Sequence, residues 1–211
     1  MKMNSKLKDR VLVVGKSGSG KTYFAKNLKK RGYWIICLDL IIQKNVMPIF
    51  EKRKKEELND NIWSLFKLFD YKDTRKIIEE ARDVFVRSVR KEMLGKRRVA
   101  VEGCLMNHQL IMDIFGDIDS FTVCFVYPKS KEVYLERIMN RFVRFPKQLG
   151  YLSFLKREGA TEALDDYFKN GLLGEKISEF LTNIVQIEYT KISTEFLPFY
   201  ISRYEVVIVN S

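Results

Sequence analysis

The sequence predicts an α/β fold in which a parallel sheet of about five strands lies between two layers of helices. Three observations predict it. Short apolar runs typical of buried strands recur along the chain, amphipathic helical patterns separate them, and a glycine-rich loop joins the first strand to the first helix. Strands that alternate with helices form parallel sheets, and the helices then cover both faces.

The expected elements follow one another without a linker, repeat or low-complexity segment, so one domain is expected over 1–211. In chain order the sequence predicts strands over 11–14, 34–38, 99–101, 120–127 and 205–209, and helices over 21–30, 51–69, 74–94, 107–115, 130–141 and 161–182.

The first strand and helix are the clearest. Residues 11–14 form a continuous apolar run, as in a strand buried on both faces. Residues 21–30 carry apolar side chains at the spacing of one helix face, and Gly32 ends that helix. The apolar run 34–38 follows at once and predicts the second strand.

The middle of the chain predicts two helices before the third strand. The helix over 74–94 has a long apolar face and ends at Gly95, a typical cap residue. The third strand then ends at Glu102-Gly103. In the second half, the fourth strand is the apolar run 120–127, and the last strand is 205–209.

Composition is that of a soluble globular protein, with 46% hydrophobic and 31% charged residues. No apolar run reaches the ~18 residues of a membrane span and no signal core is visible, so a cytoplasmic protein without a membrane partner is expected. Cys37, Cys104 and Cys124 lack metal or redox spacing and predict reduced core thiols. Because His108 is the single histidine, any metal is expected to arrive with a nucleotide.

Positive charge is concentrated near the N-terminus. Residues 1–31 hold ten Lys and Arg against one acid, Asp9, within a net charge of +11. Such a surface can attract nucleic acid. The alternative is a solvated helix face made of Lys26, Lys29, Lys30 and Arg31.

Residues 15–22, G-K-S-G-S-G-K-T, follow the first strand and open the first helix, which is the context of a phosphate-binding P-loop. Glycines let backbone N–H groups turn toward phosphate oxygens, and the helix N-terminus adds its positive dipole end. Lys21 would reach the β- and γ-phosphates of ATP, and the Thr22 hydroxyl would bind Mg²⁺. The other expected phosphate-binding residues are Gly15, Ser17, Gly18, Ser19 and Gly20.

Two acids follow later strands. Asp39, at the end of the second strand, would lie beside the γ-phosphate and orient or deprotonate an acceptor hydroxyl. Its alternative role is that of a helix N-cap. Glu102, at the end of the third strand, would hold Mg²⁺ through water, or else be an ordinary surface residue.

The segment 139–157 carries five basic residues and no acid. Such a segment can close over a triphosphate, exclude water and supply cations to the transition state, for which Arg141 and Arg144 are the candidates. Arg137 shares a helix face with Arg141. The alternative is a basic surface loop above packed aromatic residues.

The stretch GKSGSGKTYFAKNLKKRGYWIICLDLIIQ resembles the start of dephospho-coenzyme A kinases. The resemblance implies that Asp39 is the acceptor base. VYLERIMNR is similar to the helix that enters the lid of those enzymes, which implies nucleotide-contacting roles for Arg137 and Arg141. YEVVIVNS is similar to their last strand and implies that Asn210 lies near the adenine.

The sequence departs from that family in three places. Cys37 replaces the first acid of its Asp-Ala-Asp motif, EGCLM replaces Pro-Leu-Leu, and residues 44–95 match nothing in it. The sequence therefore predicts an ATP- and Mg²⁺-dependent phosphotransferase with acceptor-side helices over 40–98 and a lid over 141–158. The expected acceptor is dephospho-coenzyme A, a nucleoside or a nucleoside monophosphate. A polynucleotide 5′-hydroxyl kinase and a P-loop ATPase that is not a kinase are the alternatives.

Overall fold

Five parallel strands form one sheet in the order β2-β3-β1-β4-β5, in a computed structural model that describes residues 7–16, 18–49, 75–144, 162, 166, 169–170 and 174–211. The strands are β1 (Arg10–Val14), β2 (Trp34–Cys37), β3 (Val99–Glu102), β4 (Thr122–Tyr127) and β5 (Val206–Asn210). The parallel α/β sheet that the sequence predicts is confirmed.

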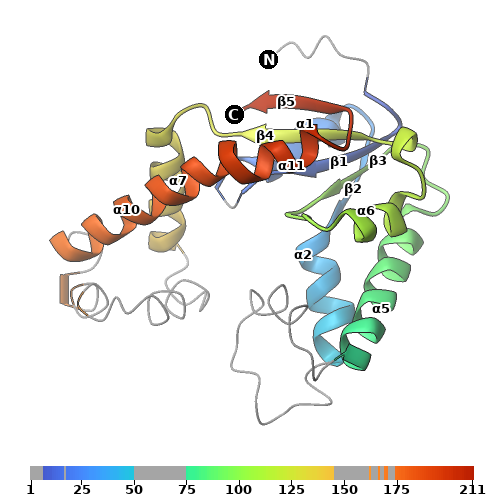
Figure 1. Cartoon of the computed structure of the whole chain (residues 1–211), viewed down its shortest axis with the longest axis horizontal. Helices are drawn as coiled ribbons and strands as arrows, with labels where there is room; N and C mark the ends of the chain where they lie inside the picture. The colour runs from blue at the N-terminus through green and yellow to red at the C-terminus, as the bar shows by residue number, and fades with distance from the viewer. Residues whose placement is uncertain are drawn as a thin grey trace.

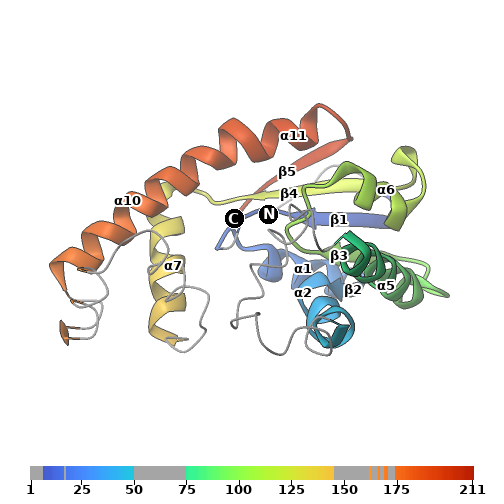
Figure 2. The same ribbon diagram turned by 60° about the horizontal axis from the view of Figure 1, so that its bottom comes forward.

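Helices connect the strands and continue past the sheet. They are α1 (Lys21–Lys30), α2 (Leu38–Ile41) with the π-helix η1 (Ile42–Val46), α5 (Arg75–Met93), α6 (His108–Phe115), the short 3₁₀-helix η3 (Ile118–Ser120), α7 (Lys131–Arg144), α10 (Glu175–Lys191) with the π-helix η5 (Ile192–Phe196), and α11 (Leu197–Ile201). Figures 1 and 2 show α10 and α11 as one nearly continuous run that crosses the sheet and extends beyond it beside α7.

Two apolar clusters, one on each face of the sheet, make the fold three-layered. Alternate side chains of a strand point to opposite faces. On β1, Val11 and Val13 pack with Phe24 and Leu28 of α1. Leu12 and Val14 belong to the larger cluster, which also takes in α5, α6, α10 and α11. Burial of each such side chain stabilises the fold by about 1.5–3 kcal/mol.

The observed boundaries correct several predicted ones. Helix α7 runs to Arg144 rather than to 141. β2 ends at Cys37 rather than at 38, because Leu38 already begins α2. Helix α10 does not end near 182 but continues to Lys191. The predicted helix over 51–69 lies outside the described residues. The predicted helices over 74–94 and 107–115 correspond to α5 and α6, and Asn107 caps α6 by accepting a hydrogen bond from the Leu110 N–H at 2.9 Å.

All five strands end at the same edge of the sheet, because they are parallel. The loop after β1 lies at this edge between the ends of β3 and β4, the neighbours of β1. In parallel sheets, ligands bind in the crevice outside the carboxyl ends of the strands. None of the helices in the described part of the chain has the length and apolar character needed to cross a membrane.

Candidate phosphate-binding site

The loop between β1 and α1 turns tightly and leads into a helix start that no side chain caps. The Ser19 N–H donates to the Lys16 carbonyl at 3.1 Å. Gly20 stands at the N-cap with φ of 97°, a left-handed conformation that favours glycine. The N–H groups of a helix's first turn have no acceptor within the helix, so this end of α1 is suited to bind an anion.

Lys21 and Thr22, the first two residues of α1, bring a cation and a hydroxyl to this loop. The Lys21 Nζ donates to the Lys16 carbonyl at 3.0 Å, so the side chain curls back over the loop. The Thr22 Oγ1 lies 3.5 Å from a carboxylate oxygen of Glu102. Three residues predicted for phosphate and Mg²⁺ are therefore near neighbours.

The face of the sheet to which the Glu102 side chain points follows from the alternation of side chains along β3. Ala100 packs in the cluster on the α1 face, whereas Val101 packs in the cluster on the other face. Glu102 therefore points to the α1 face, where Thr22 lies. Only 7% of Glu102 is exposed. The surface alternative for this acid is thus wrong, because the end of β3 is covered by its neighbours.

The donor set of Thr22 and Glu102 fits Mg²⁺. One hydroxyl and one carboxylate are hard oxygen ligands, and Mg²⁺ in proteins is bound through one or two such groups together with water and substrate phosphates. The buried carboxylate also gives a fixed negative charge beside the loop. A bound Mg²⁺ would supply charge neutralisation at the phosphates.

Asp39 lies at the end of the strand next to β3. It is exposed and is the second residue of α2, whose N-cap position is occupied by Cys37. The N-cap alternative for Asp39 is therefore wrong. Cys37 pairs in register with Glu102. Burial raises the pKa of the Cys37 thiol, and the carboxylates of Glu102 and Asp39 add to the rise, so both acids lie near this sulfur.

Because Gly103 has no side chain, the first residue of α2 can pack against it. A Cβ on Gly103 would lie 2.7 Å from the Leu38 side chain. Leu38 is buried and precedes Asp39. The absent side chain thus leaves room for the packing that positions Asp39.

Arg137 of α7 and Ser211 hold the backbone of the loop. The Arg137 Nη1 donates to the Ser19 carbonyl at 3.2 Å and to the Ser211 Oγ at 2.9 Å. The Ser211 hydroxyl also donates to the Ser19 carbonyl, and its backbone N–H donates to the Tyr127 carbonyl at 2.9 Å. The predicted nucleotide-contacting arginine is therefore bonded to the phosphate loop itself.

Gly20→Ala should weaken ATP binding at least tenfold and lower the free energy of unfolding. A Cβ at Gly20 would lie 2.7 Å from the Ser211 Oγ and 3.0 Å from the Arg137 Nη1, besides the cost of about 1–2 kcal/mol for a left-handed residue. Gly32→Ala is the matched control, since Gly32 also has a positive φ of 85° but no atom within 4 Å of its Cβ. Calorimetric titration with ATP and thermal unfolding measure both effects. Equal ATP affinity in the two variants would contradict the role of Arg137 and Ser211 in holding the loop.

Sequence reasoning missed two residues of the site, Ser211 and Glu188. The Lys16 ammonium of the loop forms an ion pair with Glu188 of α10 and lies 4.1 Å from the centre of the Phe196 ring. Glu188 is 172 residues away along the chain, and no local pattern indicates the pairing. Ser211 has no signal in the sequence beyond its position after the last strand.

The cysteines are only in part the core thiols that were expected. Cys124 is buried in β4, and burial raises the pKa of its thiol to about 12. Cys37 and Cys104 are half-buried near the loop instead. Burial raises the pKa of Cys104, and the positive charges of Lys21 and Lys16 oppose that rise.

Three predicted site residues lie wholly or in part outside the described residues. Ser17 lies outside the described residues. Arg141 and Arg144 belong to the last turns of α7, but their side chains, and the rest of the expected lid up to 158, lie outside the described part. Asn210 is exposed at the end of β5, paired in register with Tyr127.

Comparison with known proteins gives distant structural likenesses. No protein-family model matches the chain, and no curated protein matches it. Similar solved structures include TT1252 of Thermus thermophilus, with 21% identity, a TM-score of 0.47, and coverage of 74% of this chain and 81% of that one. A sugar kinase of a Janibacter species has 18% identity, a TM-score of 0.40, and coverage of 63% and 66%.

A gluconokinase of Sinorhizobium meliloti has 13% identity, a TM-score of 0.45, and coverage of 98% of this chain and 84% of its own. Likenesses this distant identify neither an activity nor a substrate. The resemblance to dephospho-coenzyme A kinases gains no support from them.

Proposed function

We propose that the protein is a kinase that transfers the γ-phosphoryl group of ATP to a nucleotide-like small molecule. One observation carries the proposal: an uncapped helix start with Lys21 curled over the glycine loop and Thr22 beside the buried carboxylate of Glu102. Phosphoryl transfer depends mainly on holding phosphates and neutralising charge, and these groups can do both.

Each residue has a defined part in this proposal. The backbone of the loop and the Lys21 ammonium bind the phosphates, and Thr22 with Glu102 would hold Mg²⁺. Arg137 keeps the loop in shape through the Ser19 carbonyl. Asn210 is proposed to contact the adenine, and Arg141 and Arg144 to add positive charge from a lid over 141–158.

Asp39 favours transfer over hydrolysis. An exposed carboxylate at the end of β2, two strands from the loop and beside the end of β3, can accept a proton from an acceptor hydroxyl. A hydrolase needs a positioned water instead. The acceptor would lie on the side formed by 40–98, of which the described residues include α2, η1 and α5.

The acceptor panel is the decisive experiment. The wild-type protein is incubated with γ-labelled ATP, Mg²⁺ and, one at a time, dephospho-coenzyme A, ribo- and deoxynucleosides, their monophosphates, and a 5′-hydroxyl oligonucleotide. We expect label on one of the small molecules. Label on the oligonucleotide alone would favour a polynucleotide kinase. Free phosphate without any labelled acceptor would favour a P-loop ATPase and overturn the proposal.

A further inference from the structure

The beginnings of β2 and β3 form a second candidate site, at the end of the sheet opposite the phosphate loop. A hollow of about 400 Å³ opens there, lined by Lys29, Gly32, Tyr33, Trp34, Gly95, Lys96, Arg97 and Arg98. The strand β3 separates it from Glu102 by four residues, which is roughly 13 Å at 3.3 Å per residue. None of these residues is among those assigned to the phosphates, to Mg²⁺ or to proton transfer in the proposed function.

The charge of this hollow is strongly positive. Four of its eight lining residues are Lys or Arg, and none is an acid. Arg98 is partly neutralised by Asp9, whose carboxylate lies 3.5 Å from its Nε. Within the described residues, Lys29, Lys96 and Arg97 form no ion pair. At least three cations are thus available to an anionic partner.

The adjacent end of α1 does not cancel that charge. Helix C-terminal carbonyls carry partial negative charge. Several of them already accept hydrogen bonds: the Arg31 N–H and the Tyr33 N–H both donate to the Leu28 carbonyl, at 2.9 and 3.1 Å, and the Gly32 N–H donates to the Lys29 carbonyl at 3.0 Å. The Arg98 Nη1 donates to the Arg31 carbonyl at 2.8 Å. The carbonyls of Leu28 and Arg31 are therefore hydrogen-bonded within the protein, which reduces the negative potential that this helix end presents to an anion.

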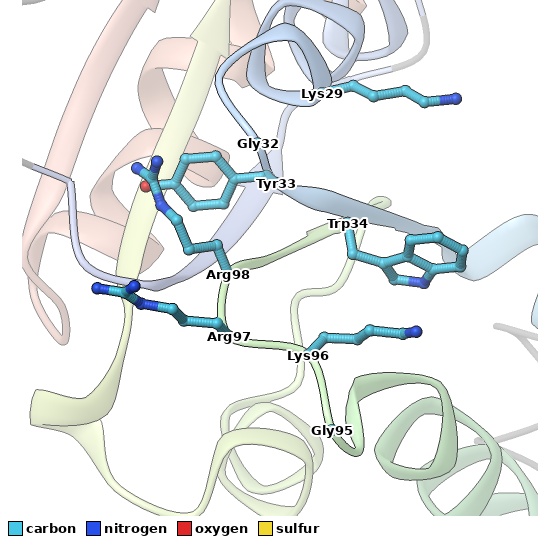
Figure 3. Close-up of a pocket in the computed structure, with 8 residues that line it drawn as sticks. All are labelled: Lys29, Gly32, Tyr33, Trp34, Gly95, Lys96, Arg97 and Arg98. Carbon is cyan, nitrogen blue, oxygen red and sulfur yellow. The ribbon is translucent and has the colours of Figure 1, made fainter.

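An exposed aromatic ring lies among the basic side chains of the hollow. Trp34 is 48% exposed, although it begins a strand. Figure 3 shows Trp34 between Lys29 and Lys96, with all three side chains projecting to the same side. The Lys96 Nζ lies 4.5 Å from the centre of the Trp34 ring. A planar base can stack on the ring while the two ammonium groups bind flanking phosphates.

The geometry points to this hollow as a docking site for single-stranded nucleic acid, with Trp34 as the stacking platform and Lys29 and Lys96 as phosphate contacts. Alternation of aromatic and basic side chains is how proteins bind single strands without reading their sequence. A duplex offers phosphates but no free base face, so it satisfies only half of the site. Lys29 belongs to the basic segment 1–31, for which the sequence predicts either nucleic-acid binding or a solvated helix face.

The test is binding of a fluorescein-labelled 20-residue oligothymidylate to the full chain, measured by anisotropy across a salt series. Removal of two single-strand phosphate contacts lowers the salt slope by about 1.4 and the affinity at 0.1 M salt by about 25-fold. We expect this of the Lys29→Gln, Lys96→Gln double variant. Lys176→Gln with Arg203→Gln is the charge-matched control, since both side chains are exposed and far along the chain from the hollow. Equal losses in the two double variants would overturn the proposal.

The stacking contact needs its own measurement. Trp34→Ala should weaken binding by about 5- to 150-fold. Because this variant could lose the fold, a second measurement uses Trp63→Phe, which leaves Trp34 as the single tryptophan. Its fluorescence should be quenched by oligothymidylate and not by a blunt 20-base-pair duplex. Absence of quenching, or equal affinity for the duplex, would overturn the stacking role and with it the proposal.

Two further arms distinguish binding in the hollow from binding at the phosphate loop and from binding of a membrane surface. The Lys21→Ala variant should bind the oligonucleotide with the affinity of the wild type, whether or not the protein is a kinase. Loss of binding would show that the oligonucleotide binds at the phosphate loop and would overturn the proposal. Vesicles containing phosphatidylserine should not compete with the oligonucleotide. Competition that depends on Lys29 and Lys96 would assign the hollow to a membrane surface instead.

Discussion

Lys21→Ala should abolish phosphoryl transfer, with a rate loss of at least about 10³-fold. A single preorganised donor to transition-state charge contributes about 10²–10³-fold, and Lys21 adds a full positive charge to its hydrogen bonds. A loss of 10³-fold corresponds to about 4 kcal/mol of transition-state stabilisation. The measurement is single-turnover transfer from γ-labelled ATP to the acceptor that the panel identifies, because product release then does not limit the rate.

The matched control for Lys21→Ala is Lys26→Ala. Lys26 lies on the same helix, is exposed, and is not among the residues that surround the loop. It removes the same charge from α1, so a general electrostatic effect would appear in both variants. We expect Lys26→Ala to keep the wild-type rate within about twofold, as for an ordinary surface substitution. A Lys21→Ala protein that retained a tenth of the wild-type rate would contradict the assignment of the loop.

The sheet was predictable from the sequence because two independent signals agree on it. β1 is a continuous apolar run, and the motif that follows it requires a strand on one side and a helix on the other. The spatial order of the strands was not predictable in the same way. It depends on which crossovers pack together, and these contacts join residues that are distant along the chain.

The long helix before β5 shows where periodicity fails. Its predicted end near 182 is wrong, since α10 continues to Lys191 and passes only there into the π-helix η5, which is followed by α11. A π-helical turn closes hydrogen bonds over five residues, so the apolar spacing of the α-helix is lost there. Pro198 then resembles a stop signal although it stands in the first turn of α11, where proline is tolerated.

Part of the candidate site was predictable from the sequence. These are the residues whose type, together with their position at a helix start or a strand end, indicates a chemical role. Lys21, Thr22 and Glu102 fall at the first helix start and at a strand end, and the parallel sheet brings these positions to one edge. The contacts of Lys16 with Glu188, and of Arg137 with Ser211, depend on how α7, α10 and the end of β5 pack against the loop. No sequence pattern records that packing.

Asp39→Asn should lower the rate of transfer by about 10²–10⁴-fold while ATP affinity changes by less than about threefold. General base catalysis contributes an acceleration of that size, and the amide cannot accept the proton. Asp39 is exposed and is the second residue of α2, so the variant should also lose a helix-dipole interaction of about 0.3–1 kcal/mol, too little to unfold the protein. Single-turnover rates and calorimetric ATP affinities are compared in the same preparation.

Glu102→Gln supplies the contrast that makes the Asp39 result decisive. Both acids lie near Cys37, but Glu102 is the buried one and contacts the Thr22 hydroxyl. Its loss should raise the Mg²⁺ concentration needed for half-maximal transfer, because it removes a proposed support of the metal. Asp39→Asn should leave that concentration unchanged, since the acceptor base acts after the metal–nucleotide complex has formed. If Asp39→Asn weakened ATP binding and slowed transfer by the same factor, the carboxylate would be part of nucleotide binding, and the acceptor base would have to be sought elsewhere.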